Sequence, residues 1–211
     1  MAVLLACFIS QLDAETSAAN EYAPVKVSFY KLHSSDTLTL KTVANGNIEV
    51  TFFNASVSDS LEIIPPLYIK SSKSTVPAVW APRSKETGGD YILIISPSNK
   101  ENSYPKILPI KADSTRIPQS SLLVANLNDQ VLDCSYNGAD FVSHPLTVTT
   151  LAKETDKLSF QAKGTKLPLY TNITMTEIEK NQRQLLILSS PHVKWSSTLS
   201  HRLVRISKEL F

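Results

Sequence analysis

The chain contains the run Tyr91-Ile92-Leu93-Ile94-Ile95-Ser96-Pro97, followed by a polar loop and a second apolar run, Lys106-Ile107-Leu108-Pro109-Ile110. The same order returns in Leu185-Leu186-Ile187-Leu188-Ser189-Ser190-Pro191 and, after another polar loop, in Arg202-Leu203-Val204-Arg205-Ile206. The two runs recur at offsets of 94 and 96 residues. Because a repeat at near-constant spacing indicates a duplicated structural unit, we expect two units in tandem.

Two weaker landmarks fit the same order. The segment Val25-Lys26-Val27-Ser28 matches Leu122-Leu123-Val124-Ala125 at an offset of 97 residues. The tripeptide Pro66-Leu67-Tyr68 matches Pro168-Leu169-Tyr170 at an offset of 102 residues. Both matches support tandem duplication.

A polar segment that ends in proline, residues 111–118, separates the two halves and is the natural linker. We therefore predict one domain over residues 22–112 and a second over residues 118–211. A single large sandwich built from the same strands is the alternative.

Short runs rich in β-branched and aromatic residues, many of them alternating with polar residues, fill both halves and predict strands. The Asn45-Gly46 pair lies between two such runs and predicts a hairpin over residues 38–53. Only residues 176–183 have a helix-forming composition, which predicts a short helix or a polar connection there. The fold class we predict is all-β, with two tandem antiparallel immunoglobulin-like β-sandwich domains.

The composition excludes several classes of function. The 211 residues are 42% hydrophobic and 19% charged, which is typical of a folded globular protein. The net charge is only +2, with no basic stripe, so nucleic acid is not an expected partner. The five glycines fit no dinucleotide or phosphate-binding fingerprint, and we expect no cofactor.

The N-terminal segment predicts export. Residues 2–9 form an apolar run that small residues follow, which is the outline of a secretory signal peptide, although no Lys or Arg precedes the run. We expect residues 1–19 to be a signal peptide, cleaved after Ala14, Ala18 or Ala19, and the protein to be periplasmic or extracellular. A buried first strand is the alternative. No later stretch reaches the roughly 18 apolar residues of a spanning helix, so no transmembrane segment is expected in the mature chain.

The two cysteines have different expected fates. Leu4-Leu5-Ala6-Cys7 resembles a bacterial lipobox, so lipid anchoring at Cys7 is a minor alternative to cleavage. Cleavage would leave Cys134 alone, without a disulfide. Since no cationic group flanks Cys134, we expect a buried, inert thiol.

A resemblance supports the fold prediction. Gly88-Gly89-Asp90-Tyr91 is similar to the Gly-x-Tyr approach to the sixth strand of many immunoglobulin-like sandwiches, where the tyrosine hydroxyl makes a corner hydrogen bond. Together with the signal and the paired halves, it resembles uncharacterised exported bacterial proteins with tandem immunoglobulin-like domains. The second half departs from the pattern, because Gln184 and Leu185 stand where the tyrosine would be. The resemblance implies no known activity.

The sequence carries no local catalytic or metal-binding motif. The four histidines, His33, His144, His192 and His201, have no second ligand at metal-binding spacing. Serine occurs neither in Gly-x-Ser-x-Gly nor in Ser-x-x-Lys at the start of a helix. Three carboxylates, Asp129, Asp133 and Asp140, lie near one another in sequence, but turn roles explain them better. We predict no catalytic residues. A secreted hydrolase whose residues converge only in three dimensions is the alternative.

Both tryptophans lie in polar segments flanked by proline, which we interpret as loops. Trp80, Arg83 and Trp195 are the candidate binding residues, because Trp and Arg dominate contact energies at recognition surfaces. The alternative is that each tryptophan covers the open end of its own sandwich. The predicted function is an exported, non-catalytic interaction module that binds a protein or a glycan; the sequence does not indicate the oligomeric state.

Overall fold

The computed structural model describes eleven segments of the chain: residues 22–32, 38–52, 56–72, 76–83, 88–96, 104–112, 120–152, 158–166, 169–175, 183–191 and 196–206. These segments form 16 strands and no helix, which confirms the all-β prediction. The signal peptide predicted over residues 1–19 lies outside them, as does most of the segment with helix-forming composition. No helix that could cross a membrane occurs in the described segments.

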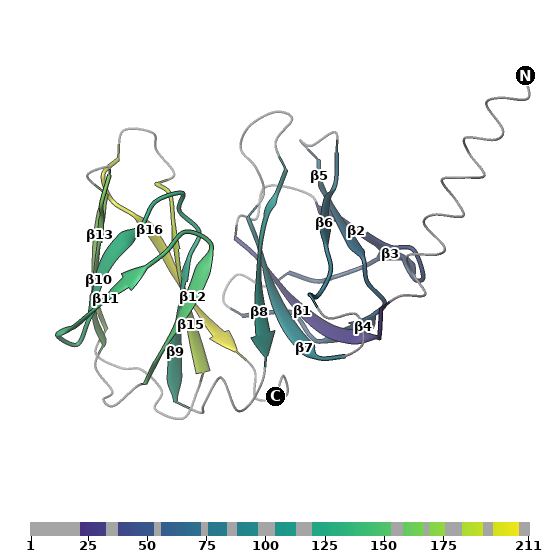
Figure 1. The fold of residues 1–211 in the computed structure, drawn as a ribbon, viewed down its shortest axis with the longest axis horizontal. Coiled ribbons are helices and arrows are strands. Elements are labelled where there is room, and N and C mark those ends of the chain that lie inside the picture. The colour runs from purple at the N-terminus through teal and green to yellow at the C-terminus, as the bar shows by residue number, and fades with distance from the viewer. Residues whose placement is uncertain are drawn as a thin grey trace, which may run out of the picture. The chain divides into compact units, whose positions relative to one another are not determined.

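The chain divides into two compact units, one of Met1–Asn54 and Ser58–Lys111, the other of Ala55–Val57 and Ala112–Phe211. The strands of the first unit are β1 (Val25–Lys31), β2 (Leu38–Thr42), β3 (Gly46–Ile48), β4 (Leu61–Ile63), β5 (Leu67–Ser71), β6 (Ala78–Trp80), β7 (Asp90–Ser96) and β8 (Lys106–Ala112). They form two four-stranded sheets with the orders β4-β1-β7-β8 and β3-β2-β5-β6 (Figure 1).

The second unit has the same topology. Its strands are β9 (Ser121–Asn126), β10 (Leu132–Tyr136), β11 (Ala139–Ser143), β12 (Thr147–Ala152), β13 (Leu158–Gly164), β14 (Tyr170–Met175), β15 (Arg183–Ser189) and β16 (Ser200–Ile206). Its sheet orders are β12-β9-β15-β16 and β11-β10-β13-β14. Adding eight to each strand number of the first unit gives these orders, so the two units are built alike.

One strand pair in each unit is parallel. β1 runs parallel to β7 and β9 runs parallel to β15, whereas the other pairs with a described register are antiparallel. The prediction of purely antiparallel sheets is therefore wrong at these two pairs. Ile92–Ile95 and Leu185–Leu188 are apolar and buried throughout, and continuous apolar runs of this kind are typical of parallel strands inside a sheet.

The glycine pair before β7 allows it to approach β1. A Cβ atom on Gly88 would lie 2.8 Å from the carbonyl oxygen of Pro24, and the Gly89 carbonyl accepts a hydrogen bond of 3.0 Å from the Lys26 amide. Tyr91 follows on β7, the seventh strand of the unit, and not on the sixth strand that the Gly-x-Tyr resemblance implies. Here the glycines serve close contact between two backbones.

The sequence repeat joins equivalent strands, but one of its matches is out of register. Leu93 of β7 faces the core of the first unit, and its equivalent must face the core of the second. On β15 the core residues are Leu186 and Leu188, whereas the offset of 94 would select Ile187. Because side chains alternate between the two faces of a strand, an offset of 94 residues matches a core residue of β7 with an outward residue of β15. An offset of 95 residues matches core residues with core residues.

The match between the two Pro-Leu-Tyr segments is fortuitous. Leu67 and Tyr68 lie on β5, in the interior of its sheet, while Tyr170 begins β14, at an edge. The strand of the second unit equivalent to β5 is β13. The matches of β1 with β9 and of β8 with β16 join equivalent strands, and they pair core residues with core residues. These two matches are therefore the ones that support a tandem duplication.

Each unit buries one hydrophobic core between its two sheets. The core of the first unit draws on both of its sheets and consists of Val25, Val27, Phe29, Leu40, Ile63, Leu67, Ile69, Trp80, Leu93 and Ile95. That of the second unit does the same and consists of Leu122, Val124, Leu132, Cys134, Tyr136, Phe160, Ala162, Ile173, Leu186, Leu188 and Leu199. Two sheets facing one core make each unit a sandwich.

The predicted hairpin is present but shorter than expected. Thr42 of β2 pairs with Gly46 of β3, and β3 ends at Ile48 instead of continuing to residue 53. Gly46 has a φ of 68°, the left-handed conformation that this type of three-residue loop requires. The Thr42 hydroxyl oxygen also accepts a hydrogen bond of 2.9 Å from the Asn45 amide.

Trp80 belongs to a strand and to the core. The loop interpretation is wrong for this residue, because Trp80 ends the edge strand β6 with only 7% of its surface exposed. Its ring packs edge-on against that of Tyr91, with 5.2 Å between centroids and 68° between planes. A three-residue strand flanked by Pro77 and Pro82 carries too little alternation to be distinguished from a loop in the sequence.

We predict that Trp80→Ala lowers the free energy of unfolding by about 3–5 kcal/mol, because it removes a buried aromatic ring and leaves a cavity. The matched control is Val79→Ala on the same strand. Val79 is 57% exposed, so its truncation is expected to change stability by less than about 0.5 kcal/mol. Urea unfolding of both variants measures this, and equal stability of the two would contradict the core assignment.

Candidate functional site

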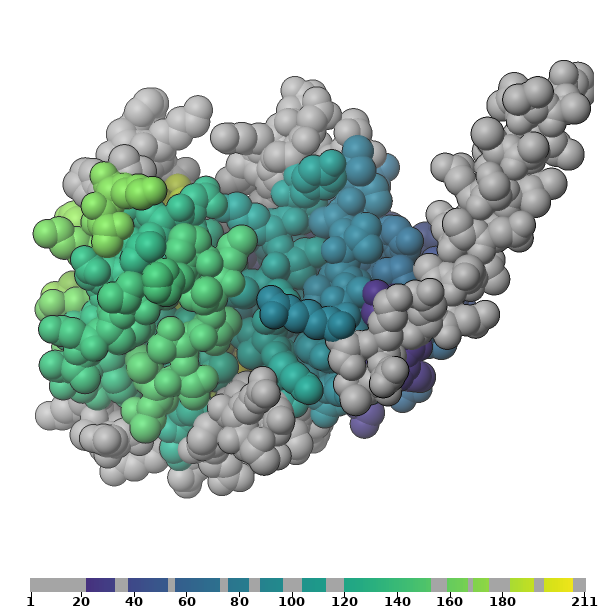
Figure 2. Space-filling view, in the orientation of Figure 1, coloured from purple at the N-terminus to yellow at the C-terminus, as the bar shows by residue number. Residues whose placement is uncertain are grey.

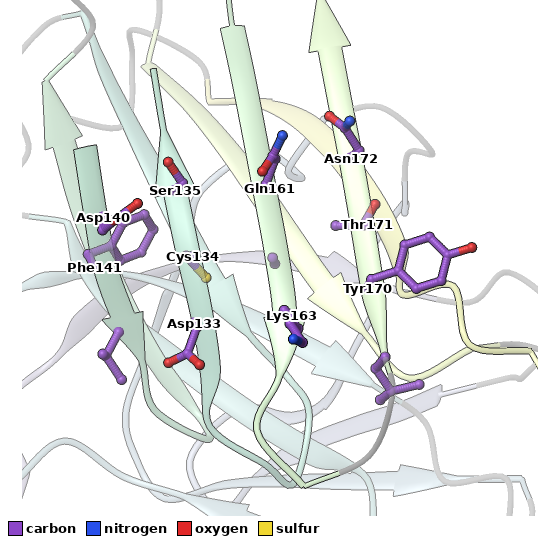
Figure 3. Close-up of a pocket in the computed structure, with 13 residues that line it drawn as sticks. Asp133, Cys134, Ser135, Asp140, Phe141, Gln161, Lys163, Tyr170, Thr171 and Asn172 are labelled. Atoms are coloured by element: carbon purple, nitrogen blue, oxygen red, sulfur yellow. The ribbon is translucent and has the colours of Figure 1, made fainter. Parts of the chain in front are cut away.

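A groove lies on the sheet β11-β10-β13-β14 of the second unit (Figure 3). Its volume is about 760 Å³. It is lined by Asp133, Cys134, Ser135, Asp140, Phe141, Val142, Gln161, Ala162, Lys163, Leu169, Tyr170, Thr171 and Asn172. All four strands of the sheet contribute, so the groove crosses the whole width of the sheet.

Alternation along these strands separates the lining residues into two sets. One set points to the core: Cys134, Ala162 and Thr171 are buried. The neighbours of these residues point outward and form two rows across the sheet. The first row is Val142, Asp133, Lys163 and Tyr170, and the second row is Asp140, Ser135, Gln161 and Asn172, in strand order. Directly opposite side chains have Cβ atoms about 4.5–5.5 Å apart, so each row is continuous.

A tight turn fixes the register of the first two strands of the groove. Asn137 and Gly138 join β10 to β11 with φ values of 49° and 87°, the pair of left-handed residues that a two-residue type I′ hairpin needs. The amide of Asn137 donates to the carbonyl of Ser159 at 2.8 Å, and its side-chain oxygen accepts from the Ser159 amide at 2.9 Å. These bonds tie the turn to β13, so β10, β11 and β13 are held in one register.

A buried amide network holds the segment that leads from β9 into β10. The side-chain amide of Asn126, which is fully buried, donates to the carbonyls of Gln130 at 3.1 Å and Ser143 at 3.0 Å. Its carbonyl oxygen accepts from the backbone amide of Asn128 at 2.9 Å. Gln130 lies just before β10 and Ser143 ends β11. The network therefore anchors β10 and β11, the two strands that carry the carboxylates of the groove.

Tyr170 forms the other end of the first row. Its backbone amide donates to Ser197 and its carbonyl accepts from Leu199, both at 2.8 Å, so the start of β14 is held on its outer edge. The side chain is 56% exposed. An anchored backbone with an exposed ring gives a contact surface that loses little conformational entropy when a ligand binds.

The outward chemistry of the groove is mixed in charge and rich in hydrogen-bonding groups. Two carboxylates, Asp133 and Asp140, and one ammonium group, Lys163, are accompanied by two amides and two hydroxyls. Asp133 lies directly opposite Lys163 in the sheet register. The carboxylates can accept hydrogen bonds from a ligand, and the amides and hydroxyls can both accept and donate them. Because charges of both signs are present, the face suits an uncharged polar ligand.

The structure separates the three carboxylates that lie close in sequence. Asp133 and Asp140 share the groove at diagonal positions, which places such residues about 7–8 Å apart. Asp129 lies in the turn after β9 and lines a smaller cavity of about 320 Å³. The two carboxylates of the groove, Asp133 and Asp140, are exposed. Their exposure suits hydrogen bonding to a ligand better than acid catalysis.

The binding residues predicted from sequence lie elsewhere. Trp80 is in the core of the first unit, and Arg83 is exposed beyond the end of β6. Neither lines the groove. Trp195 lies outside the described residues, as do His33 and His192. The sequence analysis did not predict the groove. Its signal in the sequence is the set of polar residues that alternate with apolar ones in segments such as Leu132–Tyr136.

No group of three or more metal-ligating side chains occurs within the described segments. A scan against protein-family models found no match to the chain, and a search of curated proteins found none either.

Cys134 lines the floor of the groove but points to the core. Burial, reinforced by the neighbouring Asp133 carboxylate, raises the pKa of the thiol from 9.0 to about 12. The sulfur lies 3.7 Å from the Leu132 carbonyl oxygen, to which the thiol donates. Since the thiolate is the reactive form, this thiol is inert at neutral pH.

We predict that native Cys134 resists iodoacetamide at pH 8.5 and reacts at least 100-fold faster in urea, measured by peptide mass spectrometry. Since its pKa is higher in the folded state, the stability it contributes is complete below about pH 9 and is lost as the pH rises toward about 12. The control is a chain carrying both Cys134→Ala and Ser135→Cys, which moves the thiol to the outward face. Fast labelling of native Cys134 would contradict the assignment.

Proposed function

We propose that the protein is an exported, non-catalytic binding module and that the groove on β11-β10-β13-β14 is its ligand surface. The observation that carries this proposal is the juxtaposition of eight outward side chains from four strands in two continuous rows. Both ends of the surface are fixed by hydrogen bonds, at the Asn137-Gly138 turn and at Tyr170. A rigid scaffold with an exposed, varied polar face is what a recognition module requires.

The scaffold supports the same interpretation. In the first unit, the neighbours β1 and β4 correspond to strands B and E of an immunoglobulin variable-type sandwich, and the order β3-β2-β5-β6 corresponds to its strands C′-C-F-G. The second unit repeats this arrangement with β9 to β14. We infer an immunoglobulin-like sandwich in which β7, running parallel to β1, takes the place of strand A. Sandwiches of this architecture are common in cell-surface proteins.

Export is part of the proposal and rests on the apolar run of residues 2–9. We expect the native protein to occur in the periplasm or the medium without its first 14–19 residues. Mass spectrometry of the chain isolated from each cell fraction measures this. Lipid on Cys7 would change the attachment but not the compartment, whereas an intact Met1 in a cytoplasmic fraction would overturn export.

The ligand surface is tested by truncating the ring at its end. We expect Tyr170→Ala to weaken binding to material extracted from the envelope and medium of the source cells by about tenfold, a loss of about 1.4 kcal/mol of contact energy. Biolayer interferometry with the immobilised protein over a dilution series of the extract measures the dilution that gives half-maximal binding. Since the ring is 56% exposed, the unfolding midpoint should stay unchanged.

The matched control is Tyr104→Ala, because Tyr104 is 58% exposed in the first unit and lies outside the groove. Its truncation should leave binding unchanged. A second groove variant, Gln161→Ala, should weaken binding as Tyr170→Ala does. Wild-type protein that retains nothing, or groove variants that bind as well as wild type, would overturn the groove as the ligand surface.

A further inference from the structure

The distribution of polarity over the groove is the reverse of that at a protein–protein interface. A protein interface has an apolar, uncharged centre surrounded by a polar rim. Here the centre of the first row is Asp133 opposite Lys163, and the apolar residues, Val142 and Tyr170, stand at its two ends. Val142 is 51% exposed and Tyr170 is 56% exposed. The groove therefore lacks the central apolar anchor on which tight protein binding depends.

The second row is polar along its whole length. Ser135 and Gln161 occupy its centre, and Asp140 and Asn172 its ends. Hydroxyls and amides can accept from or donate to a ligand hydroxyl group, and carboxylates can accept from it. A ligand that follows this row must present polar groups at every strand, that is, about every 4.8 Å.

The charges of the groove select against a polyion. Its outward face carries two carboxylates and one ammonium group, and Asp133 and Lys163 are direct neighbours. A polyanion would meet both carboxylates, and a polycation would meet the ammonium group. An uncharged chain meets no net opposing charge, and its hydroxyl groups can bond to both kinds of ion.

Resting on the proposed function of the groove, we propose that its ligand is a neutral polysaccharide that lies across the strands along the two rows. The ring of Tyr170 stacks against the apolar C–H face of one sugar ring, and its hydroxyl remains available to a neighbouring one. Asp133, Gln161 and Asn172 bond to sugar hydroxyls along the chain. The edge of β14 at Tyr170 is already bonded to Ser197 and Leu199, which prevents a peptide strand from adding there.

The test divides the bound material by chemistry. Envelope and medium extract is treated with sodium periodate, which cleaves the vicinal diols of sugars, or with a broad-specificity protease, and is then offered to the wild-type protein. We expect periodate to reduce binding at least tenfold and the protease to leave it unchanged. Binding that survives periodate but is lost after the protease, while Tyr170→Ala still weakens it, would overturn the polysaccharide and leave the groove in place as a site for another ligand. Binding that does not depend on Tyr170 would overturn the groove itself.

Purified polysaccharides test the same proposal without an extract. Native gels are cast with soluble β-glucan, xylan or galactomannan, and a parallel gel contains the polyanion alginate. We expect at least one neutral polysaccharide to retard the wild-type protein and Tyr104→Ala, and to retard Tyr170→Ala and Asp133→Ala at least tenfold less. Retardation by alginate alone, or equal retardation of all four chains, would contradict a neutral ligand held in the groove.

Discussion

Alternation of side chains between the two faces of a strand is the constraint on which both the core and the groove depend. On β10, Leu132 and Cys134 point to the core, while Asp133 and Ser135 point into the groove. A shift of one residue in the register would bury the Asp133 carboxylate and expose the Cys134 thiol, so it would disrupt the core and the groove together. The two-residue Asn137-Gly138 turn sets this register and therefore determines core and groove together.

The strands inside the sheets could be predicted from the sequence because their apolar runs are long. Residues 91–96 and 185–189 were predicted as strands and are parts of β7 and β15, and the Asn45-Gly46 turn forms a hairpin as predicted. The direction of pairing could not be predicted, since a run buried on both faces reads alike in parallel and antiparallel sheets. For the same reason the offset of 94 residues between the two apolar runs is one residue out of register: without alternation, a continuous run does not reveal which residues face the core.

The groove could not be predicted because edge strands form half of it. β11 and β14 contain no run of more than two apolar residues, and the start of β11 continues the Asn137-Gly138 turn in sequence. Its outward residues extend in sequence from Asp133 to Asn172, and only the sheet order brings them into two rows. Trp80 shows the opposite error: residue type suggested a recognition anchor, whereas its place on β6 puts it in the core. Residue chemistry indicates a site only once the face is known.

The equivalent faces of the two units show that the duplicated fold does not duplicate the surface. In the first unit, the row that corresponds to Asp140, Ser135, Gln161 and Asn172 is Asn47, Lys41, Tyr68 and Val79, in strand order. Thr39 and Lys70 stand opposite each other in the next row, at the positions of Asp133 and Lys163. The two carboxylates of the groove, Asp133 and Asp140, thus correspond to the uncharged Thr39 and Asn47, and the Ser135 hydroxyl corresponds to the Lys41 ammonium group. The two units therefore share a scaffold and differ in the outward residues of this sheet, which is where a fold can vary its surface chemistry without changing its core.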